Sequence, residues 1–262
     1  MLKNIYAPLS GTVAQERVID ILSNNIANAN TTGYKEDTVT FKKLLANPWP
    51  NYPSPIPPAH FKTDMSEMHP LRGNEMEYVG ISDIGTDFTV GSLKSTQNPL
   101  DFALEKSGFF VVETPFGERF TRDGSFILGN NGTLLTKNGA VVQGLRGPIT
   151  GLKEGSLEVN QRGEIFVQGR FVDQIKTMDF QNPKNLQKIG SNLFIYDGNR
   201  DEMTSSISNI QQGYIESSNV NPVKNMTNLI VAHRNYEALQ KVIKSHDEAL
   251  SQANNKIGTL PQ

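Results

Sequence analysis

The clearest pattern of apolar and polar positions lies near the end of the chain, between residues 229 and 257. Side chains that would share one face of a helix recur there at intervals of three and four residues, at Leu229, Ala232, Tyr236, Leu239, Ile243, His246, Leu250, Ala253 and Ile257. This spacing, sustained over about four heptads, is that of a coiled-coil seam. Asn221 suits an N-cap and Pro222 the first helical position, so we predict a helix from Pro222 to about Lys256, roughly 50 Å long.

Two shorter apolar seams predict a second helix at the start of the chain, from about Leu2 to Asn30. The members of these seams are Leu2, Tyr6, Leu9 and Val13, followed by Ile19, Leu22, Ile26 and Ala29. Glu16 and Asp20 stand where the first seam would continue, so the apolar stripe shifts around the helix. The Asn-rich stretch that ends at Gly33 is typical of a helix C-terminus, because Asn and Gly tolerate the left-handed conformation.

Residues 35–98 show little sustained periodicity. Within residues 47–58 there are prolines at Pro48, Pro50, Pro53, Pro55, Pro57 and Pro58. Such a run favours an extended, polyproline-like backbone. Two interpretations remain open, a disordered linker or an extended arm laid on neighbouring subunits. The apolar anchors of such an arm would be Trp49, Tyr52, Ile56 and Phe61.

The middle of the chain, from about Leu100 to Tyr196, changes to short β-rich runs separated by turn dipeptides such as Asn131-Gly132 and Asn138-Gly139. The predicted strands are Gly108 to Thr114, Glu118 to Thr121, Ser125 to Leu128, Thr133 to Thr136, Ala140 to Gln143, Leu157 to Asn160, Glu164 to Gln168, Arg170 to Phe180 and Asn192 to Tyr196. We therefore predict a central antiparallel, hairpin-rich β domain.

These patterns predict an α+β fold in four parts. The parts are an N-terminal helix (1–34), an extended linking segment (35–98), a β-rich outer domain (99–205), and a return segment with the C-terminal helix (206–262). An apolar seam is stable in water only when another helix covers it, so the two terminal helices are expected to form a coiled-coil-like pair. The seams alone leave open whether this pair is an internal hairpin docked on the β domain or also packs against other copies.

Composition narrows the classes of function. The formal charge is −2, from 25 basic and 27 acidic residues, which argues against a nucleic-acid partner. There is no cysteine, so disulfides, thiolate metal sites and cysteine nucleophiles are excluded. The start of the chain lacks the pattern of a cleavable signal, and no apolar run approaches the length that spans a bilayer. Taken alone, these features predict a soluble, cytoplasmic protein without membrane insertion.

Residues that could support catalysis or bind a metal are sparse. His233 and His246 would lie about 20 Å apart along the C-terminal helix, too far to share one metal ion. None of the 22 glycines forms a strand-to-helix phosphate-binding loop, and those in Asn-Gly and Asp-Gly pairs are better explained by turns. Arg122-Asp123 beside Gly124 is interpreted as an ion pair flanking a turn. We expect no enzymatic activity, no cofactor, no metal and no small-molecule substrate.

Three stretches resemble the flagellar axial proteins, the family of rod, hook and hook-associated subunits. The first is the run from Leu22 to Lys35, Leu-Ser-Asn-Asn-Ile-Ala-Asn-Ala-Asn-Thr-Thr-Gly-Tyr-Lys, which is similar to the N-terminal signature of that family. The second is Gln212 to Asn221, Gln-Gly-Tyr-Ile-Glu-Ser-Ser-Asn-Val-Asn, placed directly before the terminal helix as in the family. The third comprises Pro99 to Leu104, Gly108 to Phe110 and Phe120 to Ser125, which occur in the order of the rod proteins.

The resemblance implies a structural subunit of the flagellar basal-body rod. Hook proteins carry an added outer domain for which this chain has no residues, so the choice lies among rod subunits. Gly147-Pro148-Ile149 and the run from Asn219 to Val223 are more similar to the proximal-rod type, with the distal-rod type as the alternative. A secreted adhesin or binding module is an alternative of a different class, which would not need both terminal helices.

Membership of that family implies export through the flagellar type III apparatus without signal cleavage, and assembly in the periplasm with copies of itself and other axial subunits. It would replace the cytoplasmic expectation. The residues expected to take part in assembly are Leu9, Val13, Leu22, Asn24, Asn25, Ile26, Asn28, Asn30, Gly33, Tyr34, Leu229, Tyr236, Leu239, Ile243 and Leu250. For the four asparagines, capping of the helix end is the competing interpretation. In an isolated monomer we predict that the terminal helices are largely disordered, because their seams lack partners.

Overall fold

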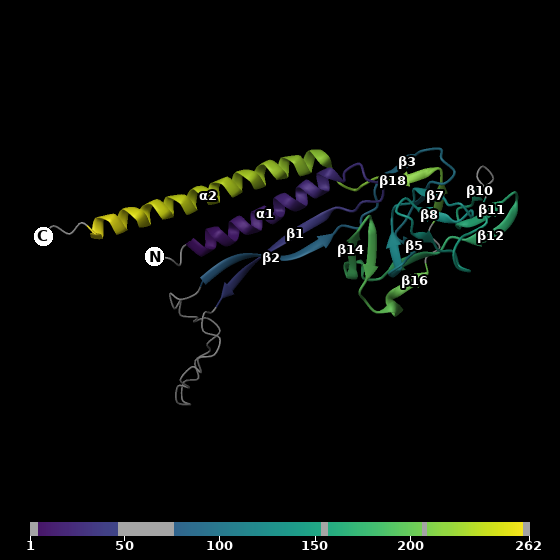
Figure 1. Cartoon of the computed structure of the whole chain (residues 1–262), viewed down its shortest axis with the longest axis horizontal. Helices are drawn as coiled ribbons and strands as arrows, with labels where there is room; N and C mark the ends of the chain where they lie inside the picture. Colours follow the sequence, from purple (N-terminus) through teal and green to yellow (C-terminus); the bar gives the residue numbers. More distant parts are fainter. Residues whose placement is uncertain (1–4, 47–75, 153–156, 206–208, 259–262) are drawn as a thin grey trace, which may run out of the picture. The chain divides into compact units, whose positions relative to one another are not determined.

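The computed structural model describes residues 5–46, 76–152, 157–205 and 209–258. The chain has an α+β fold in which a helix near each end flanks antiparallel strands (Figure 1). It forms two compact units. Unit 1 comprises Met1–Ser23, Val39–Ile84 and Met226–Gln262, and unit 2 comprises Asn24–Thr38 and Gly85–Asn225. Each unit therefore draws on segments that are far apart in the sequence.

The largest sheet of unit 2 has nine strands, seven of them in the order β14-β15-β6-β5-β9-β8-β7, while β13 joins through β5 and also pairs with β16. Its strands are β5 (Phe109–Thr114), β6 (Gly117–Thr121), β7 (Phe126–Leu128), β8 (Leu134–Thr136), β9 (Val141–Val142), β13 (Thr177–Phe180), β14 (Leu186–Gly190), β15 (Leu193–Tyr196) and β16 (Met203–Ser205). All the pairings described within it are antiparallel.

Three smaller antiparallel sheets complete unit 2. One contains β10 (Leu157–Val159), β11 (Glu164–Val167) and β12 (Arg170–Gln174). The other two join strands distant in sequence, β4 (Phe102–Leu104) with β17 (Ile210–Gln212) and β3 (Leu93–Ser95) with β18 (Tyr214–Glu216). The C-terminal return segment thus pairs with the segment that enters the β domain.

Strand β5 lies between two apolar cores. Alternate residues of a strand point to opposite faces, and the first four residues of β5 are all buried. Phe110 and Val112 belong to one core cluster, and Phe109 and Val111 belong to the other. Aromatic pairs hold the second cluster, for example Phe109 edge-on to Phe194 with ring centroids 5.6 Å apart. Both faces of the sheet are therefore covered at β5.

The predicted β domain is confirmed, with differences in detail. The run from Arg170 to Phe180, expected as one strand, is divided into β12 and β13 because the first pairs with β11 and the second with β5. Strands β3, β4, β14, β16, β17 and β18 were not predicted. Most of these have three residues, too few for a visible alternation, and the stability of β3, β4, β17 and β18 depends on partners far along the chain.

Unit 1 contains most of helices α1 (Tyr6–Ala27) and α2 (Pro222–Gly258), together with parts of β1 (Asp37–Ala46) and β2 (Met76–Thr86), which pair as a two-stranded ribbon. The ribbon was not predicted, because residues 35–98 were expected to be an extended link. The proline-rich stretch at 47–58, with its expected anchors, lies outside the described residues.

The predicted seam of α2 is confirmed over its described part. Asn221 caps the helix, since its Oδ1 accepts a hydrogen bond from the backbone N of Lys224 at 3.1 Å. Among the described side chains of residues 226–252, those that are buried or half-buried are the predicted seam positions Leu229, Ala232, Tyr236, Leu239, Ile243, His246 and Leu250. The seam therefore faces inward in the single chain.

The first predicted seam of α1 is a different case. Tyr6, Leu9 and Val13, which we call the α1 stripe, are 43%, 49% and 54% exposed. The side of α1 that approaches α2 has small residues instead. A Cβ added at Gly11 would lie 3.2 Å from Leu239 Cδ1, and Ala14 is buried. The α1 stripe is therefore not the face that α1 turns towards α2, where small residues permit a closer approach of the helix backbones.

Candidate functional site

The three sequence stretches that resemble axial proteins meet at one place in unit 2. Gly33 donates its backbone N–H to the carbonyl oxygen of Glu216 at 2.9 Å. A Cβ added at Gly33 would lie 2.5 Å from the backbone of Arg122 and Asp123, and the φ of Gly33 is +67°. Only glycine combines this left-handed conformation with so close an approach. Gly33 thus joins the N-terminal stretch to both others.

A buried charge cluster lies beside this contact, formed by Lys35, Arg122 and Glu216. The side chains are 0%, 2% and 1% exposed. Lys35 Nζ donates to Glu216 Oε1 at 2.5 Å and to the carbonyl oxygen of Thr89 at 2.6 Å. Arg122 Nη1 donates to Glu216 Oε2 at 2.9 Å. Gly91 N also donates to Glu216 Oε1, at 2.8 Å, so both carboxylate oxygens are satisfied.

The charge cluster holds two cations against one carboxylate. Burial lowers the pKa of Lys35 and that of Arg122, and the neighbouring Glu216 carboxylate opposes the shift in each case. Arg122 also lies over the ring of Phe109, with Cζ 5.3 Å from the ring centroid. Glu216 is therefore the group that makes the burial of both cations tolerable, because without it two like charges would face each other in a medium of low dielectric.

A second network ties the end of α1 to the start of β1. The side chain of Asn25 is fully buried. Its Nδ2 donates to the carbonyl oxygen of Asp37 at 2.8 Å, and its Oδ1 accepts from the backbone N of Asp37 and from Tyr34 Oη, both at 3.0 Å. Tyr34 Oη also lies 2.9 Å from Asn24 Oδ1. Burial, followed by the charge of Asp37, raises the pKa of Tyr34 well above its ordinary value.

The start of α2 is tied to the same junction. Asn219 Oδ1 accepts from the backbone N of Glu36 at 2.7 Å, and Asn219 Nδ2 donates to the carbonyl oxygen of Asp87 at 2.8 Å. Asn225 Nδ2 donates to Glu36 Oε1 at 3.0 Å. Residues 36 and 37 therefore link the last turn of α1 and the first turn of α2 within unit 2.

The predicted assembly residues fall into three groups. Asn25, Gly33 and Tyr34 are buried, and the bonds described above hold them inside unit 2. The half-buried group comprises Leu22, Ile26, Asn28, Leu229, Tyr236, Leu239, Ile243 and Leu250. The exposed group comprises Leu9, Val13, Asn24 and Asn30. Asn28 Nδ2 donates to the carbonyl oxygen of Asn24 at 2.9 Å, as in a helix-end cap. A role of these residues in subunit contacts remains a prediction.

Lys35, Arg122 and Glu216 were missing from the predicted functional residues, although each lies within a stretch that carries the resemblance. The sequence signal that could have identified them is an ionisable side chain inside an otherwise apolar or turn-forming motif. The ion pair expected between Arg122 and Asp123 is not what the structure has. Arg122 binds Glu216, and Asp123 Oδ1 accepts from the backbone N of Ser125 at 3.0 Å, which stabilises the expected turn.

Unit 1 has an apolar groove of about 490 Å³. Its lining residues are Ala7, Pro8, Gly11, Ala14, Gln15, Phe41, Leu239 and Val242. Small residues of α1 form most of one wall, together with Gln15, and β1 and α2 supply Phe41, Leu239 and Val242. At about 100° per residue, the α1 residues of this groove and the α1 stripe lie on roughly opposite sides of the helix. Unit 1 thus offers both a row of large apolar side chains and an apolar groove.

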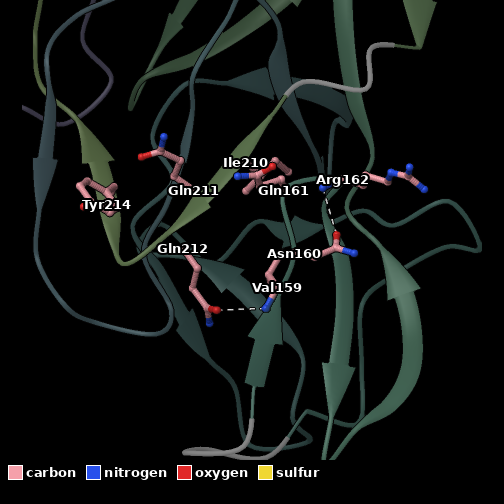
Figure 2. Close-up of a pocket in the computed structure, with 8 residues that line it drawn as sticks. All are labelled: Val159, Asn160, Gln161, Arg162, Ile210, Gln211, Gln212 and Tyr214. Atoms are coloured by element: carbon pink, nitrogen blue, oxygen red, sulfur yellow. Dashed lines mark hydrogen bonds between the residues drawn. The ribbon is translucent and has the colours of Figure 1, made fainter.

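Unit 2 has a shallow groove of about 660 Å³ with a mixed polar and apolar lining, between the β10–β11 turn and β17 (Figure 2). The side chains of Gln212 and Asn160 are engaged within the chain. Gln212 Oε1 accepts from the backbone N of Val159 at 3.0 Å, and Gln212 Nε2 donates to the carbonyl oxygen of Leu157 at 2.9 Å. Asn160 Oδ1 accepts from the backbone N of Arg162 at 3.0 Å. The two bonds of Gln212 join β17 to β10.

Neither a metal site nor a membrane helix is found in the part of the chain that the structure describes. No group of three or more His, Cys, Asp or Glu side chains there could hold a metal ion. None of its helices is both long enough and apolar enough to cross a membrane.

Three family models match the chain in order. Residues 5–35 match the model described as flagella basal body rod protein, and residues 103–189 match the flagellar hook protein FlgE/F/G D1 domain. Residues 211–256 match the C-terminal model of the flagellar basal body rod FlgEFG proteins. The three matches contain Gly33, Arg122 and Glu216, the residues at which the three stretches meet.

Curated relatives match almost the whole chain. The rod protein FlgG of Bacillus subtilis (strain 168) is 30% identical over 275 residues, covering 97% of this chain and 99% of the relative. The hook-basal body complex protein FlhO of the same organism is 32% identical, covering 99% and 100%. The rod protein FlgF of Mesorhizobium japonicum is 29% identical, covering 98% and 100%. The chain therefore belongs to the family of flagellar basal-body rod proteins, which are structural proteins rather than enzymes.

Proposed function

We propose that this chain is a structural subunit of the flagellar basal-body rod that polymerises through its terminal helices into the axial drive shaft, which transmits torque from the motor to the hook. Family membership supports the rod role. The observation that carries the assembly mode is the exposed apolar surface of unit 1, because Leu9 and Val13 are about half exposed on a helix that also borders an apolar groove.

The placement of these surfaces favours an open-ended assembly. A two-fold dimer brings the same patch of both copies together, whereas different patches meet in a head-to-tail contact that continues from copy to copy. The α1 stripe and the unit 1 groove lie on roughly opposite sides of α1. One copy could therefore present its stripe to a neighbour while another neighbour covers its groove.

Each such contact would be weak by itself. Full burial of three apolar side chains contributes about 1.5–3 kcal/mol each, and a stable interface usually buries about 800 Å² per partner. Tight assembly then requires many contacts at once, including the coiled-coil-like pairing of α1 with the α2 seam. Dilute monomers would remain separate, and a growing rod would add subunits cooperatively.

The location follows from the same proposal. The subunit would be exported without signal cleavage through the flagellar type III apparatus and would join other axial subunits in the periplasm. The absence of cysteine suits this route, because a thiol delivered unfolded into an oxidising space could form incorrect disulfides. Within the rod we propose the proximal type, from Gly147-Pro148-Ile149 and the run Asn219 to Val223. The distal type is the alternative, since relatives named FlgF and FlgG match with similar identity.

The proposal is tested with Leu9→Ser and Val13→Ser combined in one variant. Substitution of the α1 stripe should abolish motility in a strain that carries this variant as its only copy, and should leave unit 2 folded. The matched control is Ile127→Ser, which removes a comparably exposed apolar side chain, 43% exposed, from β7 of unit 2. Normal motility with the stripe variant would refute assembly through this surface.

Limited proteolysis provides the complementary test. The terminal helices should be cut faster in the purified monomer than in isolated basal bodies, while a core within unit 2 resists in both. A secreted binding module would behave differently, because deletion of the terminal helices would leave its activity intact. Equal resistance of the helices in the monomer and in the basal body would contradict the proposal.

A further inference from the structure

The charge cluster is the feature of unit 2 that its apolar cores do not explain. Its members come from sites far apart in the sequence, since Lys35 and Glu216 are 181 residues apart and Arg122 and Glu216 are 94 residues apart. Closing a loop of this length costs more entropy than closing a hairpin. The hairpins β5–β6, β7–β8 and β14–β15 close locally, so they are expected to form before this contact.

The segment of residues 31–37 has a docking surface that does not depend on the end of the chain. Gly33 packs against the backbone of Arg122. Asn192 Nδ2 donates to the carbonyl oxygen of Thr32 at 2.9 Å, and Lys188 Nζ forms an ion pair with Asp37 Oδ1 at 2.8 Å. These partners all precede residue 216. If the contacts were all of this kind, the segment could dock early.

The charges oppose early docking. Without Glu216, docking would bury Lys35 while Arg122, whose positive charge disfavours the Lys35 cation, lies buried nearby. An unpaired buried charge is strongly destabilising, and two like charges are worse. Arrival of Glu216 reverses this, since its two oxygens pair with both cations. Its backbone carbonyl also accepts from Gly33, so the same residue completes the backbone contact.

We propose that the charge cluster sets the order of folding: residues 31–37 dock on unit 2 only together with residues 214–219, when Glu216 reaches the site. Residues 31–37 are then among the last to dock on unit 2, although they are made early in the chain. Because residues 36 and 37 bond to Asn225, Asn219 and Asn25, this step also secures the last turn of α1 and the first turn of α2. The two helices used for assembly acquire their anchoring in unit 2 only when nearly the whole chain is present.

The biological role of this folding order, which is to control when the assembly surfaces become available, rests on the proposed function. The folding order itself is a property of the monomer. Pulsed hydrogen exchange with mass spectrometry during refolding measures it, on the full-length chain at a concentration too low for assembly. A failure of the folding order would leave the assembly tests unaffected, and a failure of assembly would leave this measurement unaffected.

In the natural sequence, peptides covering residues 31–37 and 214–219 should gain protection together, after those covering β5 and β6. Glu216→Gln should lower the final protection of residues 31–37 on the order of 100-fold, with β5 and β6 nearly unchanged. The matched control is Glu118→Gln, which removes the carboxylate of a half-exposed pair with Lys176 and should leave the order unchanged.

Lys35→Met separates an ordering role from a merely structural one. Removing this cation removes the opposition to early docking, so residues 31–37 should gain protection before residues 214–219. Adding Lys35→Met to Glu216→Gln should restore much of the protection lost in the single variant. Early protection of residues 31–37 in the natural sequence, an unchanged order in Lys35→Met, or a uniform loss of protection across unit 2 in Glu216→Gln would each overturn the proposal.

Discussion

Unit 2 and unit 1 differ in how far contacts within a single chain bury their apolar side chains and pair their buried charges. In unit 2 the central strand β5 is covered on both faces, and even the buried cations Lys35 and Arg122 have a carboxylate partner in Glu216. In unit 1 the α1 stripe stays about half exposed, and small residues such as Gly11 form the approach to α2. Contacts within one chain therefore cover the cores of unit 2 and pair its charge cluster, whereas the helices of unit 1 retain a row of half-exposed apolar side chains suited to further packing.

The largest effect is expected from truncation in the core of unit 2. Phe110→Ala removes a fully buried ring from the core cluster beside Phe102 and Phe126, which should lower the free energy of unfolding by about 3–5 kcal/mol. Urea unfolding followed by near-ultraviolet circular dichroism measures it. The control Phe116→Ala removes a ring that is 84% exposed and should cost less than about 0.5 kcal/mol. Similar costs for the two variants would remove the contrast between core and surface.

Gly33→Ala should rank next, at about 3 kcal/mol, because it combines left-handed strain with overlap against the backbone of Arg122 and Asp123. Gly139→Ala isolates the strain, since Gly139 has a φ of +81° and open space around its Cβ position. That control should cost about 1–2 kcal/mol in the same unfolding measurement. Equal losses would mean that the close approach at Gly33 contributes nothing.

Leu239→Ala and Leu9→Ala test whether the half-buried seam and the exposed α1 stripe of unit 1 contribute differently to the stability of the monomer. Leu239 lies on the half-buried seam against Gly11, so its truncation should cost about 1–2 kcal/mol in thermal unfolding followed by far-ultraviolet circular dichroism. Leu9→Ala, on the exposed α1 stripe, should change the monomer by less than about 0.5 kcal/mol. If Leu9 cost as much as Leu239, the stripe would already be used inside the chain.

The smallest effect is expected for Tyr34→Phe, which removes the hydroxyl that binds Asn24 and Asn25 and should cost about 1 kcal/mol at neutral pH. The pKa of Tyr34 is raised in the folded state, so the folded chain keeps a proton that the unfolded chain loses above about pH 10. Stability from this group should be full below pH 10 and fall as the pH rises further.

The difference between the natural chain and Tyr34→Phe isolates this group, because the lowered pKa of Lys35 acts in the opposite direction in both. Urea unfolding at a series of pH values should show the two chains converging above pH 10. A constant difference across that range would show that Tyr34 does not contribute to the pH dependence.

The elements that could be predicted from the sequence are those with local causes. The α2 seam, its Asn221 cap and the hairpins around turn dipeptides follow from periodicity and turn chemistry over neighbouring residues. The three-residue strands β3, β4, β17 and β18 could not be predicted, because each depends on pairing with a strand about a hundred or more residues away. The β1–β2 ribbon was missed for a similar reason, since a long proline-rich stretch separates its strands.

The features of the candidate site also differ in whether contiguous residues or distant contacts determine them. By itself, the sequence determined an α+β chain with two amphipathic terminal helices, a hairpin-rich middle and the motifs of an axial protein, because each of these features is written in contiguous residues. Only the tertiary structure decided that Lys35, Arg122 and Glu216 share one buried cluster, that Asn25 bonds inside the chain, and that Leu9 and Val13 remain exposed. Burial and charge pairing depend on which distant segments meet, and a one-dimensional pattern does not contain that information.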